Sequence, residues 1–200
     1  HAAGFADAKI VASNDLDEHL IGDIIEQGAR IDIWGVGTKL VTAYDQPALG
    51  GVYKLGASRD ARGQWRDAIK LSEQPIKISN PGVLGVKRLS RAGELVGDVI
   101  YDVERGLALP IKLHDIEHPQ RAALSPSYDA IADLLQPALV RGVPSGPRPS
   151  LDAARARAAA DLAALSPRTK RFANPQPYAV GLDDHVHGRK LELIAKAHAS

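Results

Sequence analysis

The sequence has no cysteine and no methionine among its 200 residues. The absence of cysteine excludes disulfides, thiolate metal sites and cysteine nucleophiles, and it fits a reducing compartment such as the cytoplasm. No apolar stretch approaches the roughly 18 residues that a membrane-spanning helix needs. The opening HAAGFADAK also lacks the long apolar segment of a signal peptide. Because the chain begins with His1, we expect a piece of a longer protein whose upstream residues hold part of the chemistry.

Positively and negatively charged residues are nearly equal in number. The chain has 25 Lys and Arg residues against 24 Asp and Glu residues, a formal net charge of +1. This balance leaves no electrostatic footprint for nucleic acid, and we expect neither a nucleic-acid nor a membrane partner. Apolar residues make up 44% of the chain, which is ordinary for a soluble globular protein. The length suffices for one large domain or two small ones, with no need for a stabilising disulfide or metal.

The first 60 residues carry the pattern of a strand–helix–strand unit. The runs AKIVAS (8–13) and RIDIWGVG (30–37) are typical of buried strands. Between them we expect a helix that Asn14 or Asp15 caps and that Gly28 ends. Its apolar positions at helical spacing are Leu16, Leu20, Ile21, Ile24 and Ile25. A unit of this length joins two parallel strands by a right-handed crossover, which predicts α/β structure here.

The middle of the chain, residues 61–124, is expected to be β-rich. The run VYKLGAS (52–58) leads into it and is predicted to be a strand. Residues 87–104 contain RAG between two strand-like runs, which predicts a β-hairpin. The run ALPIKLHD (108–115) is predicted to be a further strand.

The last part of the chain, residues 125–200, is expected to be helical. SYDAIADLLQPALV (127–140) is predicted to be a helix, and RGVPSGPRPS (141–150) a linker. Ser150 is then expected to cap an alanine-rich helix over 151–165, with an acidic residue in its first turn. HGRKLELIAKAHAS is predicted to be a terminal helix.

Two strand ends offer candidate ligand-binding residues. The turn GVGT, with Gly35, Gly37 and Thr38, follows a strand and precedes a short helical stretch. That layout binds phosphate through backbone N–H groups, although a glycine pair at a strand end is more often only a turn. Ser13 and Asn14 follow the other strand, at the edge where parallel sheets bind ligands. The alternative for Asn14 is that it only caps the following helix.

The histidine pairs do not predict a metal site. His114 and His118 are four residues apart, the spacing of a helical metal pair, but their stretch follows a strand-like run and ends at Pro119. No third ligand lies nearby in the sequence. DDHVH (183–187) is interpreted as solvated surface, as is the basic face of 151–165. We therefore expect no tightly bound metal ion.

Four blocks of the sequence, taken in order, resemble nicotinate phosphoribosyltransferase. They are AKIVASNDLDEHLI, QGARIDIWGVGTKLVTAYDQPALGGVYKL, IKLSEQPIKISNPG and KRFANPQPYAVGL. The resemblance runs from about residue 5 to about residue 185. It implies α/β structure: part of an incomplete, TIM-like barrel of a type II phosphoribosyltransferase, followed by a β-rich, α+β C-terminal region.

The resemblance also implies an activity and its partners. The family makes nicotinate mononucleotide and diphosphate from nicotinate and 5-phosphoribosyl diphosphate, with ATP hydrolysis, in NAD biosynthesis. ATP and Mg²⁺ are the implied cofactors, and a homodimer and the N-terminal part of the same enzyme are the implied partners. Two alternatives stay open: a phosphoribosyltransferase that uses nicotinamide, and a non-catalytic module that binds a phosphate–sugar.

The resemblance assigns binding residues but no catalytic residue. It places the 5-phosphate at Gly37 and Thr38, and a weaker phosphate or diphosphate contact at Lys54. The family's phosphorylatable catalytic His and its nicotinate-binding Arg lie N-terminal to these blocks, so we expect no turnover from the chain alone. The phosphate- and ribose-binding residues that the resemblance implies are Ser13, Asn14, Gly35, Gly37, Thr38 and Lys54.

Overall fold

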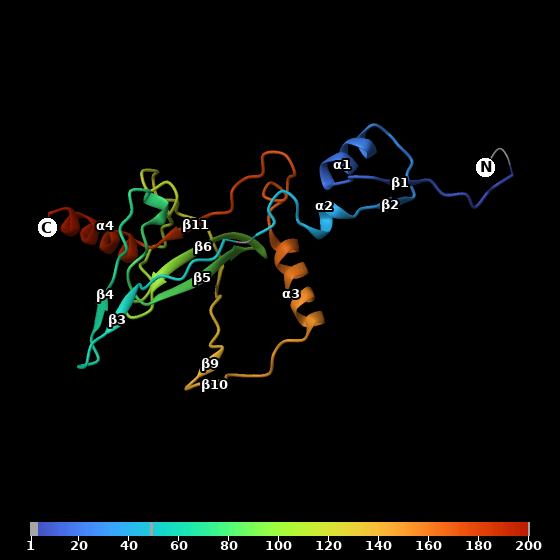
Figure 1. Cartoon of the computed structure of the whole chain (residues 1–200). Helices are drawn as coiled ribbons and strands as arrows, with labels where there is room; N and C mark the ends of the chain where they lie inside the picture. The colour runs from blue at the N-terminus through green and yellow to red at the C-terminus, as the bar shows by residue number, and fades with distance from the viewer. Residues whose placement is uncertain (1–3, 49, 200) are drawn as a thin grey trace. The chain divides into compact units, whose positions relative to one another are not determined.

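The structure is a computed structural model that describes residues 4–48 and 50–199. The chain divides into two compact units, His1–Tyr53 and Lys54–Ser200, whose elements are labelled in Figure 1. The first unit holds one small parallel sheet, and the second holds a five-stranded sheet with the C-terminal helix. None of the helices among the described residues is long and apolar enough to cross a membrane.

The first unit confirms the predicted strand–helix–strand order. Strand β1 (Val11–Ser13) pairs in parallel with β2 (Ile33–Gly35), and helix α1 (Glu18–Glu26) connects them. A short helix, α2 (Thr38–Val41), follows directly. Both strands are shorter than the apolar runs suggested, because the pairing covers only three residues on each side.

The start of α1 differs from the prediction. Asp17 caps the helix, and its carboxylate accepts a hydrogen bond of 2.7 Å from the backbone N–H of Leu20. Asn14 and Asp15 have φ angles of 88° and 47°, whereas a capping residue has extended backbone, so the prediction of either as the cap was wrong. Gly28 does follow the helix end, and its φ of 82° is the left-handed conformation that glycine favours.

The first unit buries very little apolar surface. Leu16 is the one buried residue among its described positions, and α1 has none. The exposed fractions of Ile10, Ile25 and Ile33 are 56%, 56% and 46%. Parallel strands normally have both faces covered, so this unit presents apolar faces that a further layer would bury.

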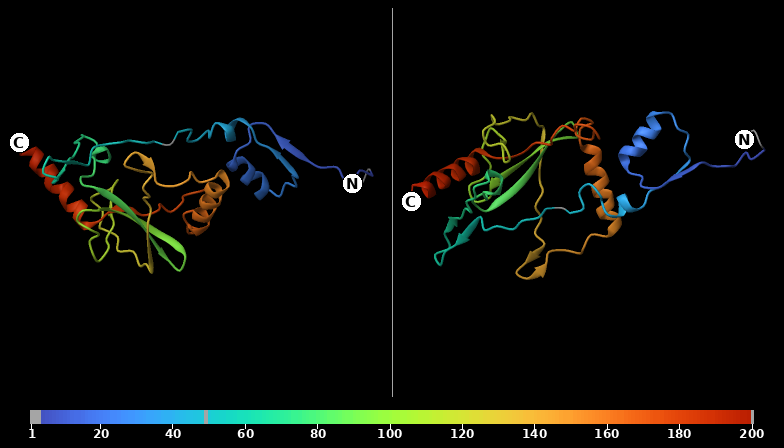
Figure 2. Two further views of the ribbon diagram at one scale, coloured as in Figure 1. Left: turned by 90° about the horizontal axis from the view of Figure 1, so that it is seen from below. Right: turned by 45° about the horizontal axis from the view of Figure 1, so that its top comes forward.

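The second unit is built on a long hairpin, shown from two further sides in Figure 2. Strands β5 (Leu84–Arg91) and β6 (Glu94–Asp102) pair antiparallel across a two-residue turn, which confirms the predicted hairpin. Ala92 and Gly93 both have positive φ, as a type I′ turn requires. Strands β7 (His114–Asp115), β11 (Val180–Leu182) and β8 (Ala130–Asp133) complete a sheet of order β7-β11-β6-β5-β8, in which only β11 and β6 run parallel.

The core of the second unit lies against this sheet. Leu89 and Val99 are fully buried, and Ile111 and Leu113 are nearly so. Arg88 forms two 3.0 Å hydrogen bonds to the carboxylate of Asp98, which is 7% exposed, and thereby joins β5 to β6. The partly buried residues packed against this core are Val96, Leu107, Tyr128 and Ala179.

Several predictions for the second unit differ from the structure; the strand predicted over 108–115 is reduced to β7. The region 127–140 contains β8 and β9 (Leu139–Val140) and no helix, because β8 pairs with the free edge of β5. β9 forms a small hairpin with β10 (Val143–Pro144), which runs from the end of the predicted helix into the predicted linker. The run 52–58 is mostly irregular, and its strand, β3 (Ala57–Arg59), begins late and pairs with β4 (Trp65–Asp67). A 3₁₀ turn, η1 (Pro75–Lys77), follows.

The two long helices confirm their predictions. Helix α3 (Leu151–Ala164) begins after Ser150, whose hydroxyl accepts a 3.1 Å hydrogen bond from the backbone N–H of Ala153. Helix α4 (Asp184–His198) starts a few residues before the predicted terminal helix. α4 packs against β6 and β11, and Val186 is its buried apolar anchor.

Candidate functional site

The carboxyl ends of β1 and β2 lie side by side in the first unit. Ser13 and Gly35 are register partners, and both are exposed. A Cβ at Gly35 would lie 3.1 Å from the Cβ of Ser13, so glycine allows this close approach at the strand ends. Ligands of parallel sheets bind at such carboxyl ends, so the structure brings two of the predicted residues to one edge.

The turn after β1 leaves Asn14 free of a capping role. With Asp17 acting as the cap, Asn14 is exposed in a left-handed conformation at φ 88°. Asp15 follows at φ 47°, so two consecutive non-glycine residues have positive φ. Backbone of this kind is strained and is enriched at binding sites.

The turn after β2 exposes backbone N–H groups. Gly37 precedes α2 with φ of −124° and ψ of −101°, which is neither extended nor helical backbone, and makes no side-chain capping bond. Nothing lies within 4 Å of where its Cβ would be, so this backbone is open to a ligand. Thr38, the first residue of α2, is also exposed, and the first N–H groups of a helix have no intrahelical partner. The turn can therefore donate several hydrogen bonds to an anion.

An ion pair that the sequence reasoning missed connects the two turns. Lys39 of α2 pairs with the carboxylate of Asp17 at the start of α1. The backbone N–H of Leu20, and then Lys39, lower the pKa of Asp17, while Asp17 raises the pKa of Lys39. Asp17 lies three residues before Leu20, which is the usual spacing between a capping side chain and its N–H partner. This spacing could have identified Asp17 as the cap. The pair ties the turn after β2 to the turn after β1.

Lys54 is not brought to this edge within the first unit. It is the first residue of the second unit, and its Nζ donates a 2.8 Å hydrogen bond to the carbonyl oxygen of Lys77. The phosphate contact expected of Lys54 stays a prediction.

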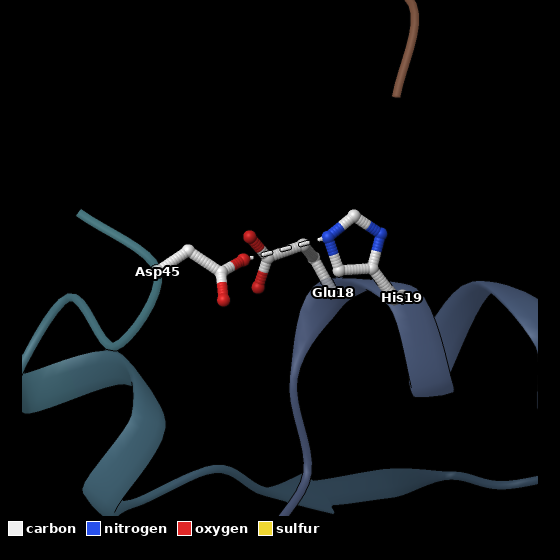
Figure 3. Close-up of side chains that lie close together, drawn as sticks. All are labelled: Glu18, His19 and Asp45. Atoms are coloured by element: carbon white, nitrogen blue, oxygen red, sulfur yellow. Dashed lines mark ion pairs between the residues drawn. The ribbon is translucent and has the colours of Figure 1, made fainter. Parts of the chain in front are cut away.

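One group of side chains in the first unit has metal-ligating chemistry. One ligand atom each from Glu18, His19 and Asp45 lies within 4.8 Å of the others, and all three residues are exposed (Figure 3). His19 Nε2 is 3.6 Å from an Asp45 oxygen. The contact between His19 and Asp45 links α1 to the segment after α2 at the protein surface.

The histidines in the two candidate pairs of the second unit make hydrogen bonds and ring contacts with neighbouring residues. His114 Nε2 lies 2.6 Å from an Asp184 oxygen, and Lys112 lies 3.1 Å from the other. The hydrogen bond to His114 is the main reason that the pKa of Asp184 is lowered. The rings of His114 and His187 stack at 3.9 Å, and burial lowers the pKa of His187. His118 lies in the turn after β7, where its backbone N–H donates to Asp115.

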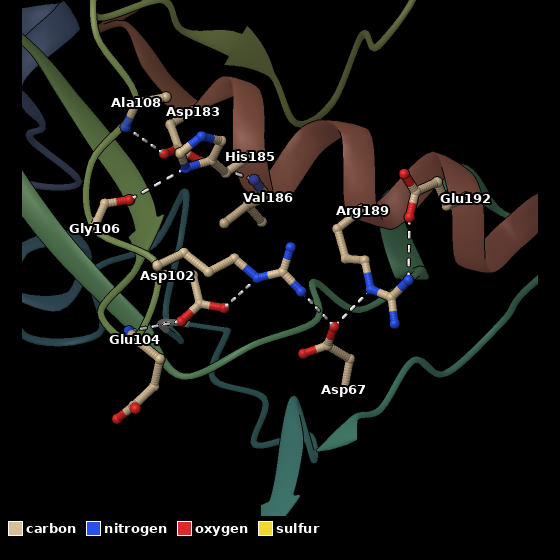
Figure 4. Close-up of polar contacts among 11 residues, drawn as sticks. Asp67, Asp102, Glu104, Gly106, Ala108, Asp183, His185, Val186, Arg189 and Glu192 are labelled. Carbon is tan, nitrogen blue, oxygen red and sulfur yellow. Dashed lines mark hydrogen bonds and ion pairs between the residues drawn. The ribbon is translucent and has the colours of Figure 1, made fainter. Parts of the chain in front are cut away.

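A polar network joins α4 to the rest of the second unit (Figure 4). Asp183 is fully buried and accepts hydrogen bonds from the backbone N–H groups of Val186 (2.8 Å) and Ala108 (3.0 Å). The interpretation of 183–187 as solvated surface was therefore wrong: Asp183 caps α4 and is buried, Val186 is also buried, and only His185 is exposed. Asp67 of β4 accepts a 2.6 Å bond from Arg189 of α4.

These features define an α/β protein whose two parallel strands end in exposed turns, the second of which contains Gly37. The family model described as the nicotinate phosphoribosyltransferase C-terminal domain matches residues 86–190. The nicotinate phosphoribosyltransferase of Bacillus subtilis (strain 168) is 37% identical over 196 residues, which are 96% of this chain and 40% of that protein. The human enzyme is 33% identical over 192 residues, or 93% of this chain and 34% of its own length. This chain belongs to the nicotinate phosphoribosyltransferase family.

The fold agrees with that of a solved relative. The crystal structure of human nicotinic acid phosphoribosyltransferase matches with a TM-score of 0.61 at 24% identity. The match covers 96% of this chain and 35% of the human one. The chain thus spans well under half the length of the relatives it matches.

Proposed function

We propose that this chain is the C-terminal part of an enzyme that forms nicotinate mononucleotide and diphosphate from nicotinate and 5-phosphoribosyl diphosphate. The reaction is coupled to ATP hydrolysis and serves NAD biosynthesis. Family membership supports the activity. The observation that carries the role of this part is the pairing of Ser13 with Gly35 at two exposed parallel strand ends.

The proposed contacts use neutral donors. The backbone N–H groups at Gly37 and Thr38 would hold the 5-phosphate, together with the Thr38 hydroxyl. Ser13 and Asn14 would bind the ribose and its phosphate from the neighbouring turn. Because Asp17 already pairs with Lys39, hydrogen bonds rather than Lys39 would hold the 5-phosphate.

The open apolar faces of the first unit support a larger assembly. We propose that β1, α1 and β2 belong to an incomplete, TIM-like barrel whose other strands come from the N-terminal part of the enzyme. Covering both faces of β1 and β2 would bury residues such as Ile10 and Ile33, which are about half exposed within this chain. We also propose that the enzyme is a homodimer and that it is located in the cytoplasm.

The one clustered group with ligand chemistry among the described residues does not suit Mg²⁺, so we propose that the ion arrives with the substrate. Mg²⁺ prefers oxygen ligands and is commonly bound by substrate phosphates with one or two carboxylates. The Glu18, His19 and Asp45 group includes an imidazole nitrogen, which suits transition metals better than Mg²⁺. When bound, Mg²⁺ and ATP would supply charge neutralisation and driving force, and this chain would contribute the neutral donors around the 5-phosphate.

Replacing Gly37 tests the proposed phosphate contact. In the full-length enzyme, Gly37→Trp should weaken 5-phosphoribosyl diphosphate binding by about tenfold or more, equivalent to about 1.4 kcal/mol, because the ring would cover the open backbone. Gly146→Trp is the matched control, since no atom lies within 4 Å of a Cβ there either. Calorimetric titration measures both. Affinity within twofold of the wild type for Gly37→Trp would refute the assignment.

Each of the two alternative functions predicts a different outcome in an activity assay. A phosphoribosyltransferase that uses nicotinamide would form nicotinamide mononucleotide when nicotinamide replaces nicotinate as the base. A non-catalytic phosphate–sugar module would bind 5-phosphoribosyl diphosphate and give neither product, even with the N-terminal part supplied.

A further inference from the structure

The second unit contains a cavity of about 500 Å³ with no part in the site described above. Its walls include Trp65 and Asp67 of β4, Glu104 and Arg105 after β6, and Arg189 of α4. This volume is within the range of small-molecule sites.

Two guanidinium groups converge in this cavity, where Figure 4 shows the network around Asp67. The same Asp67 oxygen accepts a 2.6 Å bond from Arg189 Nε and a 3.3 Å bond from Arg105 Nη2. Arg105 Nε also lies 3.5 Å from an oxygen of Asp102. Each guanidinium has five N–H donors, so these contacts leave donors for another acceptor.

The acids lie deeper than the arginines. The side chains of Asp67 and Asp102 are 10% and 7% exposed, whereas those of Arg105 and Arg189 are 46% and 34% exposed. Both arginines are therefore more accessible from solvent than Asp67 and Asp102. Glu104 and Glu192 are the exposed acids beside them, and Arg189 donates a 3.1 Å bond to Glu192. The carboxylates beneath hold both guanidiniums in fixed positions, which reduces the ordering cost of binding.

An aromatic ring lies on the same side as the arginines. Side chains two apart on a strand share a face, so Trp65 lies on the face of β4 from which Asp67 reaches Arg189. Trp65 is 41% exposed, although tryptophan is usually well buried. The Arg59 guanidinium lies over the Trp65 ring, 5.6 Å from its centroid, so a flat ligand ring would stack at an offset on the opposite face.

We propose that this cavity binds an aromatic anion, with its ring on Trp65 and its phosphate or carboxylate on Arg105 and Arg189. A nucleoside monophosphate and an aromatic carboxylate are the two sources of this chemistry. Glu104, exposed on the same wall, disfavours ligands of high negative charge such as polyphosphates. The inference rests on the second unit alone and is independent of the proposed catalytic function.

Tryptophan fluorescence tests the site directly, because the chain has two tryptophans. In a Trp34→Phe background, titration with adenosine monophosphate or with nicotinate should quench Trp65 saturably, and the tighter ligand identifies the source. Adenosine alone and inorganic phosphate alone should each bind at least about tenfold more weakly, since each lacks one half of the recognition.

Variants separate binding from structural support. Arg105→Met should weaken the tighter ligand about tenfold, and Glu104→Gln should strengthen it, because one removes a cation and the other an anion. Arg62→Met, an exposed arginine outside the cavity, is the matched control and should leave binding unchanged. Circular dichroism checks that each variant is folded. Binding of the tighter ligand no stronger than that of inorganic phosphate, no saturable quenching by either ligand, or no change in Arg105→Met would overturn the proposal.

Discussion

Replacing Asp183 with alanine should be among the most costly single changes in the second unit. Its carboxylate is fully buried, caps α4 through the Val186 N–H and also accepts the Ala108 N–H. Loss of a helix cap costs about 1 kcal/mol. Leaving a buried N–H without an acceptor costs a further 1–3 kcal/mol, roughly, and Ala108 is only 8% exposed. We therefore expect Asp183→Ala to lower the free energy of unfolding by about 2–4 kcal/mol.

Urea unfolding followed by circular dichroism measures this loss. Ser150→Ala is the matched control, because Ser150 also caps a helix but has an exposed backbone partner, and it should cost about 1 kcal/mol. Asp183→Asn keeps one acceptor oxygen and should fall between the two. The reasoning is refuted if Asp183→Ala costs no more than Ser150→Ala, because the buried bond to Ala108 would then contribute nothing.

Two further predictions concern the turns of the first unit and the acid sensitivity of the second. Lys39→Met should weaken 5-phosphoribosyl diphosphate binding in the full-length enzyme several-fold, because it releases α2 from Asp17; unchanged calorimetric affinity would contradict this. Burial, reinforced by neighbouring cations, lowers the pKa of His187 below its usual 6.5, so the unfolded chain binds its proton more readily. Stability should therefore fall as the pH drops below about 6.5, and His187→Phe should reduce this loss in melting temperature between pH 7.5 and 5.5. An equal loss in the variant would argue against a half-buried, neutral His187.

Local patterns predicted the elements that depend on neighbouring residues. The hairpin of β5 and β6 follows from two strand-like runs around Ala92 and Gly93, whose positive φ values make the turn. The cap at Ser150 fixes the start of α3 in the same local way. The strand–helix–strand order of the first unit follows from apolar spacing and from Gly28.

The errors came from contacts between distant residues. Residues 130–133 became the edge strand β8 because β5, some 40 positions earlier, offers unpaired backbone groups, with Lys87 pairing with Asp133. The conformation of Asn14 and Asp15 could not be read from their types, since both residues favour caps and turns alike. Among the candidate site residues, Ser13 and Gly35 could be predicted because parallel strands align their ends, whereas the Lys39 contact depends on how two helices meet.

The central claim is that this chain supplies the phosphoribosyl-binding turns of a nicotinate phosphoribosyltransferase. The most direct test measures nicotinate mononucleotide formation after the chain is combined with the N-terminal part of the enzyme, with nicotinate, 5-phosphoribosyl diphosphate, ATP and Mg²⁺ present. We expect product only when both parts are present, and a sharp loss of product when the chain carries Gly37→Trp. Steady product formation by the chain alone, or an unchanged rate with Gly37→Trp, would contradict the account.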